Sequence, residues 1–195
     1  MRAAIRSFVI RGGRLTVAQE RALRELWPRY ALEYTGATLD LPGAFGRRAP
    51  LHLEIGFGAG EVLANRAAAH PEHDFLGIEG HRPGVGRLLL AAEAQGLGNL
   101  RIFCHDAVEV LQHSLPEGSL DEAAIFFPDP WHKKRHHKRR LIQAPFVALL
   151  ATRLKPGGLL RLATDWQNYA EQMLAVCNAA PELENLAAGG YAERP

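Results

Sequence analysis

The stretch Leu51-His52-Leu53-Glu54-Ile55-Gly56-Phe57-Gly58-Ala59-Gly60 decides the fold of this 195-residue chain. Its first half is mainly apolar and favours a buried strand, and the glycines after it favour a sharp turn into a helix over residues 60–69. Glycine allows a backbone to turn tightly and to approach a ligand without interference from a Cβ atom. The stretch therefore predicts the first strand and the ligand-binding turn of an α/β domain.

The sequence after this turn alternates between apolar strand patterns and helical patterns. Further strands are expected at residues 75–79, 100–104, 122–127 and 159–163, and further helices at residues 83–95, 141–154 and 167–178. This alternation predicts an α/β fold that is Rossmann-like, a doubly wound and mostly parallel sheet with helices on both faces. Ligands of such sheets lie beyond the carboxyl ends of the strands.

The first 50 residues are expected to form a basic N-terminal extension with one helix. Thr16 and Gln19 have the spacing of a capping box, which predicts a helix over residues 16–30. A loop rich in Gly and Pro follows over residues 36–50. We therefore expect two parts, the extension over 1–50 and the Rossmann-like domain over 51–195.

The composition limits the class of protein. With 47% hydrophobic residues the chain can bury one sizeable core. No apolar run reaches the length of a membrane span, and Arg interrupts the apolar stretches of the first 14 residues, so a cytoplasmic protein without a membrane segment is expected. Cys104 and Cys177 lie among apolar neighbours, and the histidines lack metal-ligand spacing. Neither a disulfide nor a metal is expected.

The charge is distributed unevenly along the chain. Residues 1–50 hold nine Arg against four acidic residues, and residues 133–140, KKRHHKRR, hold six Lys or Arg and no acid. The remainder holds 8 Lys or Arg against 17 Asp or Glu, a net charge of −9. An acidic body with two concentrated basic segments is typical of an enzyme that carries a surface for a polyanion.

Three acidic side chains at the ends of successive strands predict a nucleoside-binding site. Glu54 precedes the turn of Gly56 and Gly58, whose G-x-G-x-G spacing differs from the G-x-G-x-x-G of dinucleotide sites. Glu79 ends the second strand, where an acid can accept hydrogen bonds from ribose hydroxyls. Asp106 follows the third strand, where it can contact the adenine base of the same bound nucleoside. Each has a structural alternative: a turn that binds nothing, an exposed acid beside Arg82, and a helix cap at Asp106.

The fourth and fifth strands end in further candidate residues. Asp129 stands between Pro128 and Pro130, which restrict the backbone and would hold its carboxylate near the reactive end of a ligand. The basic run begins four residues later, which favours nucleic-acid binding over a solvated loop or a targeting tract. Asp165 follows the fifth strand, where it could also be the N-cap of the last helix.

Several segments together resemble bacterial tRNA (guanine-N7)-methyltransferases over nearly the whole chain. They are LHLEIGFGAGE (51–61), GIEGHRPGVG (77–86), FPDPWHKKRHHKRRL (127–141), TDWQNYAEQML (164–174) and the early RGGRLTVAQERAL (11–23). The resemblance implies a class I methyltransferase fold, S-adenosyl-L-methionine as cofactor, tRNA as partner, and methylation of guanine 46 of the variable loop at N7.

The resemblance also implies roles for individual residues. Cofactor contacts are expected from Glu54, Gly56, Gly58, Glu79, Asp106 and Asp129, and catalysis from Asp129. Substrate binding is expected from Lys133 and Asp165, and RNA binding from Arg135, His136, His137, Lys138, Arg139 and Arg140. The family pattern continues into a Thr-x-Phe-Glu motif, whereas this sequence stops at Glu193-Arg194-Pro195, so we expect the C-terminal end of the domain to be missing.

Other functions remain open from the residues. A nicotinamide-dependent oxidoreductase would share the fold, but the glycine spacing and the PDPW segment disfavour it. An adenine amino-methyltransferase fits the sequence better than the oxidoreductase, because PDPW is similar to the Pro-rich acidic motif of those enzymes. A non-catalytic RNA-binding module would explain the basic run but not the cofactor-site residues. The chain is expected to act as a monomer or a homodimer.

Overall fold

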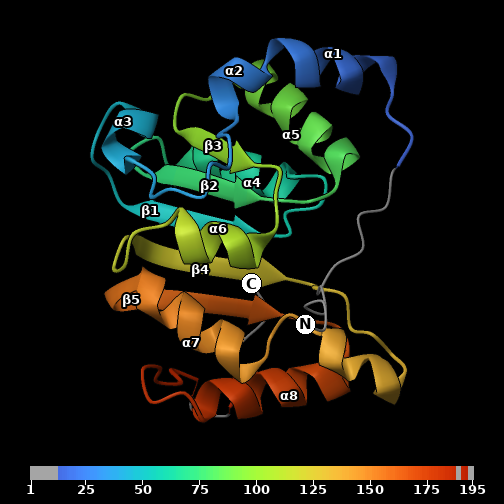
Figure 1. Ribbon diagram of the computed structural model, residues 1–195, viewed down its shortest axis with the longest axis vertical. Helices are drawn as coiled ribbons and strands as arrows, with labels where there is room; N and C mark the ends of the chain where they lie inside the picture. The colour runs from blue at the N-terminus through green and yellow to red at the C-terminus, as the bar shows by residue number, and fades with distance from the viewer. Residues whose placement is uncertain (1–12, 188–189, 193–195) are drawn as a thin grey trace.

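The first strand lies at the centre of a five-stranded parallel sheet whose strand order is β3-β2-β1-β4-β5 (Figure 1). The strands are β1 (Leu51–Ile55), β2 (Asp74–Ile78), β3 (Leu100–Phe103), β4 (Leu120–Phe126) and β5 (Leu154–Ala163). The computed structural model describes residues 13–187 and 190–192. The predicted doubly wound fold is confirmed.

Helices cover both faces of the sheet (Figure 1). They are α1 (Val17–Glu25), α2 (Trp27–Tyr30), α3 (Leu41–Phe45), α4 (Glu61–Ala69), α5 (Arg82–Ala94), α6 (Ala107–His113), the 3-10 helix η1 (Lys134–Arg139), α7 (Ala144–Arg153) and α8 (Gln167–Asn178). Phe75 packs in one apolar cluster with Leu63 of α4 and Leu88 of α5, whereas the next residue, Leu76, packs in the cluster of α6, α7 and α8. Successive residues of this strand therefore point to opposite faces of the sheet and pack in two apolar layers.

The direction of winding reverses beside β1. Its last residue, Ile55, pairs with Ile78 of β2 and with Ile125 of β4, so three carboxyl ends lie at one edge of the sheet. The chain runs outward from β1 to β3 and then returns to the other side of β1. In doubly wound sheets this reversal, beyond the carboxyl ends, is where ligands bind.

Several boundaries differ from the sequence prediction. The helix over 16–30 starts with the predicted capping box of Thr16 and Gln19 but ends at Glu25, and Pro28 lies in the first turn of the separate helix α2. Residues 41–45, expected in a loop, form α3. The basic run, which lies outside the expected strands and helices, forms η1, and α7 begins at residue 144 instead of 141.

The Gly157-Gly158 pair lies inside β5. Gly157 has a φ of 78°, and the pairing of β4 with β5 shifts register between Leu120 and Glu122. A left-handed residue in a strand produces a local bulge, which glycine adopts without a Cβ clash. The strand therefore starts at Leu154, ahead of residue 159, where it was predicted to begin.

The described part of the N-terminal segment packs on the domain. Buried Gln19 donates from Nε2 to the carbonyl of Pro83 at the start of α5 (3.1 Å), and the fully buried Tyr30 donates from its hydroxyl to the carbonyl of Ala92 (3.2 Å). The division at residue 50 stays a prediction. Arg2, Arg6, Arg11 and residues 193–195 lie outside the described residues.

None of the helices in the described ranges is long and apolar enough to cross a lipid bilayer.

Candidate functional site

A cavity of about 240 Å³ opens between the carboxyl ends of β1, β2 and β4, where the winding reverses. Three residues predicted from separate stretches of sequence lie in its wall, namely Gly56, Glu79 and Asp129. The other lining residues are Ile55, Ile78, Gly80, His105, Ala107, Ile125, Phe126, Phe127, Pro128 and Leu141.

The other predicted site residues do not line this cavity. Glu54 and Asp106 are the sequence neighbours of lining residues, and Gly58 is hydrogen-bonded to Glu79. The predicted substrate and RNA contacts also lie outside the wall, at Lys133, Asp165 and residues 135–140. The structure therefore brings the cofactor candidates together around one cavity and places the RNA candidates on a neighbouring surface.

The glycine turn depends on left-handed backbone and on close packing. Gly56 and Gly58 have φ angles of 74° and 58°, which residues larger than glycine rarely adopt. A Cβ atom on Gly84 of α5 would lie 2.1 Å from the carbonyl oxygen of Gly58. The turn and the first residues of α5 therefore approach each other as closely as their backbones allow.

Glu79 connects this turn to α5. Its Oε2 accepts from the backbone N–H of Gly58 at 3.0 Å, and its Oε1 accepts from the N–H of His81 at 2.9 Å. A carboxylate offers about four lone-pair sites, so two acceptor positions remain for a ligand in the cavity. The structure therefore gives Glu79 a structural bond to the turn and leaves it able to accept from a pair of hydroxyls.

Glu54 is a buried carboxyl at the end of β1, just before the turn. The residue is 5% exposed, and its Oε2 has no hydrogen-bond partner among the described residues. Burial raises its pKa to about 7, with Arg66 lowering it and Glu122 raising it by smaller amounts. A buried oxygen without a partner costs free energy, so this carboxyl is ready to bind a donor or a cation.

Asp106 acts as a helix cap. Its Oδ1 accepts from the N–H groups of Val108 (2.8 Å) and Glu109 (3.3 Å) at the start of α6. Of the two alternatives that the sequence left open, the N-cap is thus present. A contact of its other oxygen with a ligand is compatible with the cap and stays a prediction.

The turn that carries Asp129 has strained backbone at both ends. Phe127 and Trp131 have φ angles of 51° and 49°, and Pro128 and Pro130 stand between them. Left-handed conformations of bulky residues cost about 1–3 kcal/mol each and occur mainly at functional sites. Asp129 itself is exposed at the mouth of the cavity. The sequence predicted the proline restraint but not the strain, because φ is set by surrounding contacts.

Most cations of η1 face solvent. Lys134, Arg135 and Lys138 are exposed, and the guanidinium of Arg139 lies 5.1 Å from the ring centre of Trp131. The pKa of His136 is lowered by desolvation and then by neighbouring cations, so this imidazole is mainly neutral at pH 7. The run therefore presents a cationic surface that begins beside the cavity.

Arg140, the C-cap of η1, differs from the rest of the basic run because it is only 2% exposed. Its Nε donates to the carbonyl of Pro130 at 2.8 Å, and its Nη1 donates to Gln172 of α8 at 2.7 Å. Its Nη2 donates to Asn168 at 3.0 Å, and the guanidinium covers the Tyr169 ring at 4.7 Å. All three nitrogens are occupied within the protein. We therefore do not retain Arg140 as a phosphate contact.

The loops after β4 and β5 meet beside the cavity. The rings of His132 and Trp166 lie edge to face, with centroids 4.3 Å apart. The N-cap position of α8 is Trp166 and not Asp165, so the capping alternative for Asp165 is wrong and its exposed carboxylate is available to a substrate. Neither His132 nor Trp166 was singled out in the sequence, because their contact joins two segments that are distant along the chain.

Known proteins are similar to this chain over most of its length. The family "Putative methyltransferase" matches residues 48–194. A tRNA (guanine-N(7)-)-methyltransferase of Alkalilimnicola ehrlichii is 61% identical over 183 residues, covering 93% of this chain and 77% of that protein. One of Thiobacillus denitrificans is 59% identical over 194 residues, covering 100% and 85%. A precorrin-6y C5,15-methyltransferase structure from Geobacter metallireducens aligns with a TM-score of 0.54 at 15% identity, covering 67% of this chain and 62% of that one, which shows a shared fold alone.

Proposed function

Because the chain belongs to the family of tRNA (guanine-N(7)-)-methyltransferases, we propose that it transfers a methyl group from S-adenosylmethionine to N7 of guanine 46 in the variable loop of tRNA. One observation carries the proposal. A single cavity joins the glycine turn and Glu79 to the turn that holds Asp129, and the cationic helix η1 begins shortly after that turn, at Lys134.

The residues around the cavity fit the cofactor. Glu79 has acceptor positions left for a ribose diol, and Glu54 has a buried oxygen close to the glycine turn that has no partner in the described part of the chain. The left-handed Gly56 brings backbone and no side chain to the cavity wall. We assign cofactor binding to these residues and to Gly58, Asp106 and Asp129. When bound, S-adenosylmethionine supplies a methyl group on a cationic sulfur, and carboxylates favour a cation.

The chemistry requires little of the protein beyond positioning and electrostatics. The N7 lone pair of guanine lies in the ring plane and is unprotonated near neutral pH, so no base is needed to expose it. Methylation places positive charge on the purine and makes its N–H groups more acidic. The exposed carboxylate of Asp129 accepts hydrogen bonds from those groups and stabilises the charge as it develops. The strained, proline-bounded turn keeps this carboxylate at the cavity mouth.

The cationic helix accounts for tRNA binding. Arg135, Lys138 and Arg139 contact phosphates, a sequence-independent interaction that leaves recognition to the shape of the RNA and to an accessible loop base. Lys133 and Asp165, both exposed, contact the substrate nucleotide. We place the reaction in the cytoplasm, where tRNA is modified.

The test is methylation of bulk tRNA by the purified chain, followed by digestion and mass spectrometry of the nucleosides and of mapped fragments. We expect 7-methylguanosine, confined to position 46. Methylated adenine would favour an amino-methyltransferase instead. Saturable tRNA binding without binding of S-adenosylmethionine in calorimetry would favour a non-catalytic RNA-binding module.

A further inference from the structure

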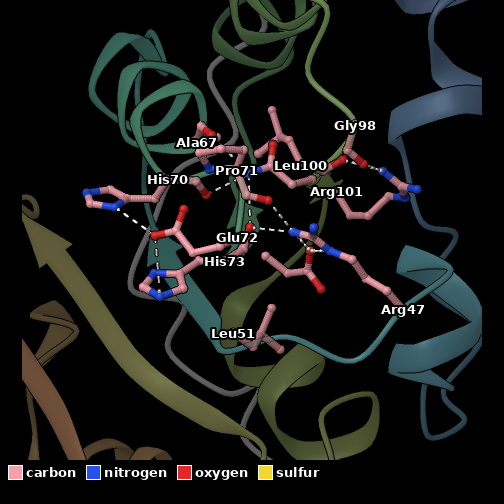
Figure 2. Close-up of polar contacts among 12 residues, drawn as sticks. Arg47, Leu51, Ala67, His70, Pro71, Glu72, His73, Gly98, Leu100 and Arg101 are labelled. Atoms are coloured by element: carbon pink, nitrogen blue, oxygen red, sulfur yellow. Dashed lines mark hydrogen bonds and ion pairs between the residues drawn. The ribbon is translucent and has the colours of Figure 1, made fainter.

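A second group of polar side chains lies at the opposite edge of the sheet from the cavity, in the turn between α4 and β2. His70 Nδ1 lies 3.2 Å from Glu72 Oε1, and His73 Nε2 lies 3.7 Å from the same oxygen (Figure 2). Each of the three residues offers a ligand atom, and these atoms all lie within 4.8 Å of one another. The side chains of His70, Glu72 and His73 are 53%, 60% and 30% exposed, so an ion can reach them.

Two of the three separations between these atoms are close to those of tetrahedral coordination. Zinc binds imidazole nitrogen and carboxylate oxygen at about 2.0–2.1 Å, which places neighbouring ligand atoms of a tetrahedron roughly 3.3 Å apart. The separations of 3.2 Å and 3.7 Å lie on either side of this value. The remaining separation, between the two imidazoles, can close by side-chain rotation because His70 is exposed.

The backbone of this turn is already held in place. The side-chain amide of Asn99 donates to the carbonyls of Ala67 (2.9 Å), His70 (3.1 Å) and His73 (2.9 Å). Arg47 also donates to the carbonyl of His73, at 2.9 Å (Figure 2). A turn that is rigid before binding loses little entropy when a ligand binds.

We propose that His70, Glu72 and His73 form a surface site for one Zn²⁺ ion or a chemically similar divalent cation, with the fourth position open to water. Two imidazoles and one carboxylate are a ligand set that suits zinc. The sequence predicted no metal, because the spacing of these histidines shows no ligand pattern and the set depends on the turn being held by Asn99 and Arg47.

The test is calorimetric titration of the untagged full chain with Zn²⁺ at neutral pH. We expect one ion per chain, affinity lowered more than about tenfold in His70→Ala and in His73→Ala, and parent-like binding in the exposed control His113→Ala. Zn²⁺ should also raise the Tm of the parent and of the control, and raise it less in the two site variants. Absence of saturable binding, or parent-like binding by both site variants, would overturn the proposal.

An independent observation concerns Arg140. Its hydrogen-bond partners are groups of three segments, none of them a carboxylate: the carbonyl of Pro130, the amides of Asn168 and Gln172, and the ring of His137 at 3.1 Å. Burying a guanidinium is costly, and here it joins the Asp129 turn, η1 and α8 at one point. The carbonyl it binds belongs to the residue between Asp129 and the strained Trp131.

We infer that Arg140 is a positioning residue, which holds the Asp129 turn in its strained conformation. The inference rests on the proposed function, because its readout is methyl transfer. Lysine in its place keeps the charge but cannot bind three acceptors in the planar geometry of a guanidinium. The substitution should therefore displace the turn without removing a group that touches the cofactor or the tRNA.

The experiment compares Arg140→Lys and Arg140→Ala with the parent. We expect kcat at least about tenfold lower in both, a smaller loss of S-adenosylmethionine affinity because the displaced Asp129 also belongs to the cofactor site, and a parent-like salt dependence of tRNA binding. Added guanidinium ion should restore turnover to Arg140→Ala, whereas the same concentration of sodium chloride should not. A purely structural role would lower Tm without this rescue.

Two outcomes separate the inference from the proposed function. An inactive parent would contradict the proposed function, whereas an active parent with kcat of Arg140→Lys within about twofold would overturn the positioning role. If the Arg140 variants fail to fold, Asn168→Ala and Gln172→Ala each remove one acceptor from the guanidinium. Unchanged kcat in both would then overturn the inference.

Discussion

Glu79 both holds the glycine turn and faces the cavity. We expect Glu79→Ala to weaken S-adenosylmethionine binding about 10- to 100-fold, the range for one or two hydrogen bonds to a charged group, and to leave tRNA affinity near that of the parent. Part of the loss comes from the freed N–H groups of Gly58 and His81, so Glu79→Gln should lose less. Calorimetry with each ligand measures both effects. Unchanged cofactor affinity in Glu79→Ala would remove this residue from the site.

Glu54 makes stability depend on pH. Burial raises its pKa from 4.5 to about 7. The protonated carboxyl therefore contributes to the free energy of unfolding fully below pH 4.5, and this contribution is lost as pH rises through 7. Glu54→Gln should therefore gain stability over the parent as pH rises, by about 2–3 kcal/mol more at pH 8 than at pH 5. Urea unfolding at both pH values measures this. A difference that does not vary with pH would contradict the raised pKa.

Asp129 should matter most in the transition state. We expect Asp129→Ala to lower kcat about 100-fold or more, with a much smaller effect on tRNA affinity, because its carboxylate stabilises charge that develops during transfer. Asp129→Asn keeps the shape and one acceptor oxygen and should lose less. Single-turnover kinetics separates the chemical step from binding. A rate within about twofold of the parent would show that Asp129 is not catalytic.

At the scale of the element, η1 presents a surface for RNA and ends in a buried C-cap. Each lost phosphate contact lowers the magnitude of the slope of log affinity against log salt by roughly 0.7–0.9. Lys138→Gln should therefore lower this magnitude by one such step, and the double variant with Arg139→Gln by about two. Lys155→Gln, a partly exposed cation at the amino edge of the sheet, is the control and should leave the slope unchanged. Filter binding across a salt series gives the slopes. Equal slopes in Lys138→Gln and the control would make η1 a solvated helix.

At the scale of the whole molecule, the edge opposite the cavity stabilises the sheet through Glu122. Its carboxylate pairs with Arg66 at 2.8 Å and with Arg161 at 3.4 Å. Burial alone would raise its pKa, but a hydrogen bond from His52 and the charges of Arg66 and Arg161 lower it to about 2. The ionised carboxylate therefore contributes to the free energy of unfolding fully above pH 4.5, and this contribution is lost as pH falls through 2.

Glu122→Gln should therefore cost about 2–3 kcal/mol at pH 7 and less than half of that at pH 3. Denaturant unfolding at the two pH values measures the loss, and turnover of the folded variant should stay near that of the parent because the residue lies at the far edge of the sheet from the cavity. An equal cost at both pH values would mean that packing, not ionisation, accounts for the effect.

Local signals in the sequence determined most of the fold and the centre of the site. Strand periodicity, the glycine turn after β1 and the capping box at Thr16 act over a few residues, so they were recognisable without tertiary contacts. They placed Gly56, Glu79 and Asp129 after strands that a parallel sheet brings to one edge. Topology alone therefore predicted that these residues share a cavity.

Only the tertiary structure decided what individual side chains do there. Arg140 belongs to a basic run whose residues look alike in the sequence, yet its guanidinium is buried and donates to Gln172 and Asn168 of α8. The strain at Trp131 and the turn that gathers His70 and His73 likewise depend on contacts between distant segments. Charge and residue type are properties of the sequence, but burial depends on which segments pack together, and no local pattern specifies that.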